Sequence, residues 1–135
     1  MLPHFLQCGT PFIYQGQEIG MTNIDIPSIN DYKDVMTFNN WRLFKSLGFS
    51  EKRFLKLASE VSRENARTPV QWSNTENAGF TTGTPWFNIN SNYPEINVED
   101  ADKDPDSLLN FYRKAIKYRK GSELAIYGKY NELYE

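Results

Sequence analysis

The sequence has few of the residues that nucleophilic and metal chemistry usually require. Its 135 residues include one cysteine, Cys8, and one histidine, His4. A single cysteine excludes an internal disulfide and is typical of a reducing compartment, so we expect a cytoplasmic protein with Cys8 as a buried thiol. One imidazole and one thiol are too few for a typical zinc site, and a Ser-His-Asp site would depend on His4 alone. We expect no metal ion and no cofactor.

Long apolar runs and an excess of basic charge are also missing. Fifteen Lys and Arg residues stand against 17 Asp and Glu residues, a formal net charge of −2. Without a basic stripe we expect no nucleic-acid partner. No apolar run approaches the roughly 20 residues of a membrane span, and the N-terminus lacks the basic start of a signal peptide, so we expect no membrane association.

What the sequence does have is large rings. Apolar residues make up only 39% of the chain, below the roughly 45–50% of globular domains, yet aromatic residues make up 15%. This composition favours a surface that stacks against another molecule over a self-sufficient small core. A soluble domain with aromatic loops remains an alternative.

Apolar spacing predicts a helix-rich chain with two short strands. The expected order is a helix end over residues 1–8, a strand over 11–14, helices over 31–48, 50–62 and 104–121, and a strand over 123–130. The first strand lies between Gly9 and Gly16 and is apolar throughout, as in a parallel barrel whose strands are covered on both sides. Ser50 and Asp104 are the expected helix caps.

Residues 68–103 show no sustained period and predict a long functional loop, because disordered segments lack large rings. The rings of this loop are Trp72, Phe80, Trp86, Phe87 and Tyr93, interleaved with many asparagines. Ring faces stack on the apolar side of a sugar, and amides bond its hydroxyl groups. The loop therefore indicates carbohydrate binding, with packing of the rings on their own domain as the alternative.

The acidic residues predict no catalytic pair. Glycoside hydrolysis needs two carboxyl groups that flank the bond, about 5–5.5 Å apart in a retaining enzyme. Residues such as Asp34 and Glu51 belong to helix caps and surfaces, and no pair of acidic residues follows two neighbouring strands. We expect no catalytic residue in this chain.

Arg67 is the residue that we select for binding. It leaves the second predicted helix beside Thr68-Pro69, where the proline favours an extended backbone. A guanidinium is a planar fork of donors suited to paired sugar hydroxyls. The alternative is a surface ion pair with Glu64, three residues earlier.

Three motifs then carry a family resemblance. They are Gly9–Met21, Ser62–Trp72 with its Asn-Ala-Arg-Thr-Pro run, and Asn77–Trp86. In this order they resemble the C-terminal end of the catalytic barrel of oligo-1,6-glucosidases, in the α-amylase family (glycoside hydrolase family 13). No stretch of the chain resembles the segments in which that family keeps its catalytic carboxylates. Relatives often carry Glu where this chain has Gln17 and Met36.

The resemblance implies an α/β fold made of part of a (β/α)8 TIM barrel. The eighth strand and its helices would fill residues 1–121, and residues 122–135 would begin a C-terminal β domain with its first strand. It implies that Arg67 lines the pocket for the terminal glucose, and that the other substrate-binding residues are Glu18, Gln17, Trp72 and Phe80.

The implied function is that of a fragment of a retaining α-glucosidase that hydrolyses short α-1,6-linked glucans. This fragment would bind the oligosaccharide and be inactive alone. A non-catalytic carbohydrate-binding or assembly module is the alternative, and within the family so are sucrose isomerase and trehalulose synthase. Because barrel surface would be exposed, we also expect self-association.

Overall fold

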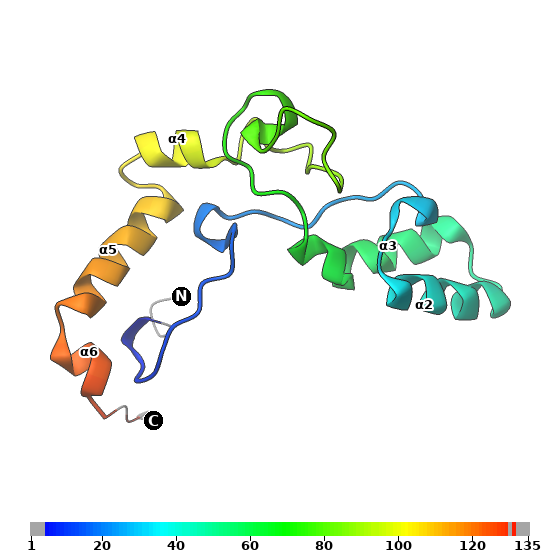
Figure 1. The fold of residues 1–135 in the computed structure, drawn as a ribbon. Coiled ribbons are helices and arrows are strands. Elements are labelled where there is room, and N and C mark those ends of the chain that lie inside the picture. The colour runs from blue at the N-terminus through cyan, green and yellow to red at the C-terminus, as the bar shows by residue number, and fades with distance from the viewer. Residues whose placement is uncertain (1–4, 130, 132–135) are drawn as a thin grey trace.

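The structure is a computed structural model, and it describes residues 5–129 and 131. These residues form an open arc of helices joined by long irregular segments (Figure 1). The 3-10 helices are η1 (Gln17–Ile19), η2 (Ile29–Asp31), η3 (Arg63–Ala66) and η4 (Glu76–Gly79). The α-helices are α2 (Val35–Ser46), α3 (Glu51–Val61), α4 (Val98–Lys103), α5 (Leu108–Lys120) and α6 (Glu123–Tyr127). None of them is long and apolar enough to cross a membrane.

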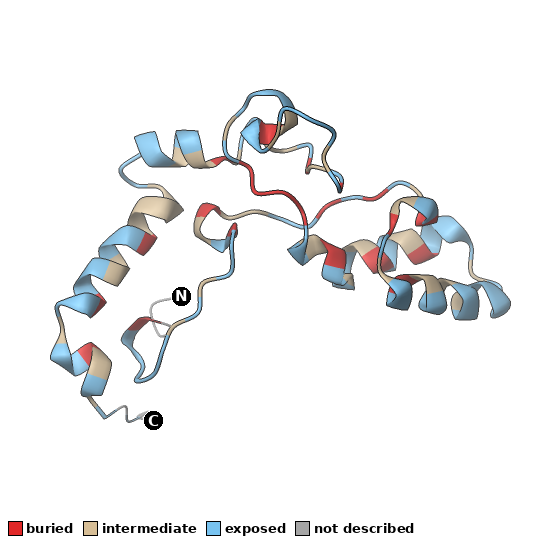
Figure 2. Cartoon of the chain, in the orientation of Figure 1, coloured by how far each residue is buried: buried red, intermediate tan, exposed pale blue. Residues whose placement is uncertain are grey.

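Helices α2 and α3 pack side by side as a hairpin with its own core (Figure 1). The hairpin core consists of the buried residues Ile24, Ile26, Ile29, Tyr32, Phe54, Ala58 and Phe87. At its centre the ring of Phe54 lies 5.3 Å from that of Trp41 and 5.5 Å from that of Phe44. Figure 2 shows buried residues on the facing sides of the two helices and along residues 68–71.

The two helices of the hairpin begin at side-chain caps. The Ser50 hydroxyl accepts a hydrogen bond from the Arg53 amide at the start of α3, which confirms the predicted cap. The Asp34 carboxylate accepts from the Met36 amide at 2.9 Å at the start of α2. Helix α2 therefore starts later than the predicted residue 31, because residues 29–31 form the separate turn η2.

The region before α5 differs from the prediction. Asp104 does not cap α5; its carboxylate accepts from the Asp106 amide, and Ser107 caps the helix by accepting from the Asn110 amide. Asn97 caps the unpredicted helix α4, whose six residues are too few to show a period. Gly121 ends α5 as expected.

Neither predicted strand is present among the described residues. Residues 10–14 have no regular secondary structure, because a strand is defined by hydrogen bonds to a neighbour and no neighbour is present. The prediction over residues 123–130 is wrong for residues 123–127, which form α6. Ser122 caps that helix by accepting from the Ala125 amide. Helix α6 packs against α5, whereas a strand there would lack a partner.

One buried guanidinium holds the N-terminal segment against α5 and α6. Arg119 donates to the carbonyl oxygens of Phe5 at 2.7 Å, Gln7 at 2.9 Å and Ala125 at 2.9 Å, and to that of Gly9. The predicted N-terminal helix end includes Phe5 and Leu6, while residues 1–4 with His4 lie outside the described residues. Cys8 is exposed and not buried as expected, because this segment is covered on one side only.

Candidate functional site

A tight turn connects residues 11–14 to η1. Gly16 has a positive φ of 88°, and a side chain there would collide with the Met21 sulfur, so glycine is required. The Gln17 amide donates to the Tyr14 carbonyl at 3.0 Å. In return the Tyr14 amide donates to the Gln17 side-chain oxygen at 3.3 Å. Gln17 is therefore an exposed side chain that is held at the turn.

The end of this segment is joined to the turn that carries Arg67. The Tyr14 hydroxyl donates to the Ala66 carbonyl, directly before Arg67. The Asn65 side chain accepts from the Ile24 amide at 3.1 Å and donates to the Ser59 carbonyl at 2.8 Å. Three segments distant in the sequence thus meet at η3.

A hollow of about 190 Å³ lies at this junction. Its lining is rich in amide and hydroxyl groups, and it consists of Tyr14, Gln15, Gly16, Gln17, Met21, Thr22, Asn23, Asn65, Ala66 and Thr68. The two residues that flank Arg67 in the chain, Ala66 and Thr68, are both part of it. Such a lining suits a neutral ligand with several hydroxyl groups.

Arg67 stands at the C-terminal end of η3 and pairs with Asp34. Its Nη1 lies 3.6 Å from Asp34 Oδ2, with the arginine side chain 43% exposed and the aspartate side chain 11% exposed. The sequence suggested a surface pair between Arg67 and Glu64. That alternative is wrong for Arg67, whose ion-pair partner among the described residues is Asp34.

Glu64 has a different role from the predicted one, because it is fully buried. Its Oε1 accepts from the backbone amides of Lys33 and of Asp34, the latter at 2.8 Å. Its Oε2 is buried without a hydrogen-bond partner among the described residues. Glu64 therefore fixes the backbone that leads into α2.

Met36 and Arg63 border the same site. Arg63 Nη2 lies 3.3 Å from the Met36 sulfur, and Arg63 Nε lies 3.9 Å from Asp34 Oδ2. Both side chains are largely exposed. Met36 thus presents an uncharged thioether to a guanidinium.

The other predicted binding residues are spread around the arc. Glu18 is partly buried, and its Oε2 lacks a hydrogen-bond partner among the described residues. Trp72 is 51% and Phe80 42% exposed, and Phe80 lines a separate open hollow with Thr75 and Thr82. Of the predicted residues only Gln17 lines the hollow that includes Ala66 and Thr68, and the binding roles of all five stay predictions.

The aromatic loop is ordered by buried amides. The Gln71 side chain donates to Asn92 Oδ1 at 3.2 Å and to the Ile96 carbonyl. Asn90 donates to the carbonyl oxygens of Thr22 and Asn23, at 3.2 and 3.1 Å. Phe87 enters the hairpin core, whereas Trp86 is exposed. The expectation that rings pack on their own domain thus holds for Phe87, and sugar binding by the exposed rings stays a prediction.

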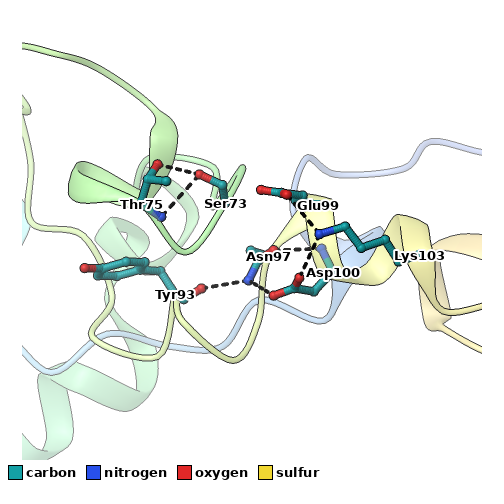
Figure 3. A network of polar contacts seen from close by, with 7 residues as sticks. All are labelled: Ser73, Thr75, Tyr93, Asn97, Glu99, Asp100 and Lys103. Atoms are coloured by element: carbon teal, nitrogen blue, oxygen red, sulfur yellow. Dashed lines mark hydrogen bonds and ion pairs between the residues drawn. The ribbon is translucent and has the colours of Figure 1, made fainter.

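Helix α4 ends the loop with a polar network (Figure 3). The Asn97 side chain donates to the Tyr93 carbonyl at 3.1 Å and accepts from the Asp100 amide at 2.9 Å. Lys103 bonds Glu99 at 2.9 Å, and this bond raises the pKa of Lys103 above its usual value. The network fixes the C-terminal end of the loop.

Asp34 is the residue of this site that the sequence did not single out. The sequence grouped Asp34 with the acidic residues of helix caps and surfaces, and that local role gave no sign of its contact with Arg67. The contact of Glu64 with the Asp34 backbone amide was not predicted either, because helical spacing suggested that Glu64 is a surface residue. No group of three or more His, Cys, Asp or Glu side chains in the described part of the chain could hold a metal ion.

We compared the chain with known protein families and solved structures. The model of the alpha-amylase catalytic domain matches residues 1–128. The chain belongs to the alpha-amylase family. An oligo-1,6-glucosidase of Parageobacillus thermoglucosidasius is 47% identical over 133 residues, which are 98% of this chain and 24% of the relative. The chain thus spans about a quarter of the length of such relatives.

Other members of the family are similarly close. A trehalose-6-phosphate hydrolase of Bacillus subtilis is 46% identical over 127 residues, 94% of this chain and 22% of the relative. The crystal structure of an isomaltulose synthase from Klebsiella sp. LX3 superposes with a TM-score of 0.89 at 42% identity, over 98% of this chain and 24% of that one. The fold is therefore part of a catalytic barrel, as the three motifs predicted.

Proposed function

We propose that this chain forms the substrate-binding part of a retaining α-glucosidase that hydrolyses short α-1,6-linked glucans. The observations that support the proposal are the half-exposed guanidinium of Arg67, paired with Asp34, and a hollow lined by amide and hydroxyl groups that includes Ala66 and Thr68, the neighbours of Arg67 in the chain. A planar cation of this kind donates two directed hydrogen bonds to neighbouring sugar hydroxyls. The exposed side chain of Gln17 adds an amide at the same hollow.

The chemical step needs groups that we do not assign to this chain. A retaining mechanism uses one carboxylate as nucleophile and a second carboxyl group as acid and base. In the described residues the buried carboxylate of Glu64 bonds backbone amides, and Asp34 pairs with two guanidinium groups. We therefore expect binding contacts here and the catalytic carboxylates in other segments of the barrel.

Several finer expectations belong to this proposal. Residues 1–121 would be barrel and residues 122–135 the beginning of a C-terminal β domain. We also expect a cytoplasmic location, from the single cysteine. The chain would require no cofactor.

The exposed apolar side chains support a proposed self-association of the isolated chain. Phe12 is 82% exposed on residues 11–14, and Leu43 and Leu47 are exposed on α2. Such surface promotes association in water. Light scattering and an apolar dye would detect it, and a monodisperse monomer without a dye signal would exclude it.

A non-catalytic carbohydrate-binding module is the second candidate, and the exposed rings of Trp72, Phe80 and Trp86 favour it. Such rings bind sugars without any catalytic group. This candidate predicts that the isolated chain binds isomaltose in calorimetry, and that no addition of barrel segments produces turnover.

The test of the proposed function uses the isolated chain and a chimera. In the chimera, residues 1–135 replace the aligned segment of the Parageobacillus thermoglucosidasius relative, which is 47% identical. We expect no hydrolysis of isomaltose by the isolated chain and hydrolysis by the chimera. Sucrose and trehalose 6-phosphate are offered in parallel to separate the other substrate classes. Turnover that copurifies with the isolated chain, or a folded chimera without activity, would contradict the proposal.

A further inference from the structure

The proposed function gives no role to two carboxylates near Arg67, those of Asp34 and Glu64. Asp34 touches Arg67, and Glu64 touches the backbone of Asp34. All three come together from η3 and the start of α2. Neither carboxylate has a binding role in the proposed function.

Asp34 makes two different contacts with its two oxygens. Oδ1 accepts from the Met36 amide and caps α2, while Oδ2 faces the guanidinium groups of Arg67 and Arg63 at 3.6 and 3.9 Å. The cap fixes the carboxylate relative to the helix, so Oδ2 has a defined direction. With its side chain 11% exposed, Asp34 is also shielded from solvent far more than Arg67.

Glu64 fixes the position from which Asp34 acts. Its Oε1 accepts from the amides of Lys33 and Asp34, and its own amide donates to the Ser62 hydroxyl at 3.2 Å. Glu64 lies in η3 and Arg67 is the C-cap of this turn, so the contact links the backbone of Asp34 to the turn that precedes Arg67. The buried Glu64 thus helps to place Asp34 near Arg67.

We infer that Asp34, held by Glu64, is a positioning residue that orients the guanidinium of Arg67 toward the sugar. A long arginine side chain has several rotatable bonds, and an exposed one samples many directions. A carboxylate on one face of the fork restricts it and leaves the other nitrogens to the substrate. This inference rests on the proposed function, because it requires Arg67 to bind the sugar.

The test is Asp34→Asn in the chimera. Asparagine caps a helix as well as aspartate does, so α2 keeps its start, while Arg67 loses its charged partner. We expect kcat/KM for isomaltose to fall about 10-fold, since small misplacements of binding groups slow catalysis strongly. The melting temperature should stay the same.

A double-mutant cycle separates positioning from a merely structural role. In an Arg67→Ala background, Asp34→Asn should change kcat/KM by less than about twofold, because the group that Asp34 orients is gone. A loss of the same size in both backgrounds would overturn the inference. Glu64→Ala should follow the same pattern, with a loss that disappears in the Arg67→Ala background.

A matched control completes the design. Asp102→Asn removes a carboxylate of α4 from its exposed ion pair with Arg113 and should leave kcat/KM unchanged. If Arg67→Ala alone leaves the kinetics unchanged, the proposed function of Arg67 fails. If Arg67→Ala lowers kcat/KM and Asp34→Asn does not, only the present inference fails.

Discussion

The α2–α3 hairpin and the N-terminal segment of residues 5–14 are held in place by opposite means. The hairpin has its own apolar core with Phe54 at the centre and a cap at the start of each helix. Among the described residues, the N-terminal segment is held by the carbonyl contacts of Arg119, by the hydrogen bond from the Tyr14 hydroxyl to Ala66, and by the rings of Phe5 and Tyr112, which lie 5.2 Å apart. Local signals were thus sufficient for the hairpin, whereas residues 11–14 need neighbours to become a strand.

The largest effect should come from the hairpin core. Phe54→Ala should lower the free energy of opening of α2 and α3 by about 3–5 kcal/mol, because it leaves a cavity among buried rings. Native-state hydrogen exchange of the chimera would measure it. Val61→Ala on the exposed end of α3 is the control and should stay within about 0.5 kcal/mol. Equal losses in the two variants would mean that the hairpin has no core of its own.

Arg119→Met should lower the free energy of opening of residues 5–14 and leave that of the α2–α3 hairpin unchanged. The substitution leaves four carbonyl oxygens without their charged donor and should cost about 2–3 kcal/mol in the opening of residues 5–14. Exchange in α2 and α3 should stay unchanged. The control is Arg113→Met on the same helix, which breaks an exposed ion pair worth at most about 1 kcal/mol. Faster exchange in the hairpin as well would show that the two regions form one unit.

The smallest effect concerns the pH dependence of the hairpin. Burial raises the pKa of Tyr32 above its usual value of 10.0, and the charges of Glu64 and Asp25 raise it further. Above pH 10 the unfolded state then loses the tyrosine proton before the folded state does, so stability falls as pH rises.

Tyr32→Phe should flatten this fall and leave stability near neutral pH almost unchanged, because the buried hydroxyl lacks a hydrogen-bond partner among the described residues. Tyr118→Phe, on the exposed face of α5, should keep the wild-type profile. Urea unfolding of the chimera at pH 7 and above pH 10 would measure both. An unchanged fall in Tyr32→Phe would assign the pH dependence to other groups.

The sequence predicted correctly those elements whose stabilising contacts join residues close together in the chain. Ser50 and the apolar rows of α2 and α3 act within a few residues, so those helices were predicted correctly apart from the start of α2. Helix α4 was missed because it is short, and α6 was predicted as a strand from a loose alternation of apolar residues.

The site was predictable only in part. Arg67 was selected from its position before Thr68-Pro69 and Gln17 through the family resemblance, and the structure places Gln17 at the hollow lined by the residues that flank Arg67. The pairing of Arg67 with Asp34 joins distant parts of the chain, and no local pattern encodes such a contact. Glu64 was misassigned because helical spacing alone does not show which face is buried.

The most direct test of the central claim is the specificity constant of the chimera for isomaltose with Arg67 replaced. Loss of a charged hydrogen bond to the sugar costs about 1.5–3 kcal/mol, so Arg67→Ala should lower kcat/KM roughly 10- to 150-fold with little change in stability. Arg67→Lys should not restore it, because an ammonium lacks the planar fork. An Arg67→Ala chimera with unchanged kinetics would contradict the account and leave Arg67 as an ordinary surface residue.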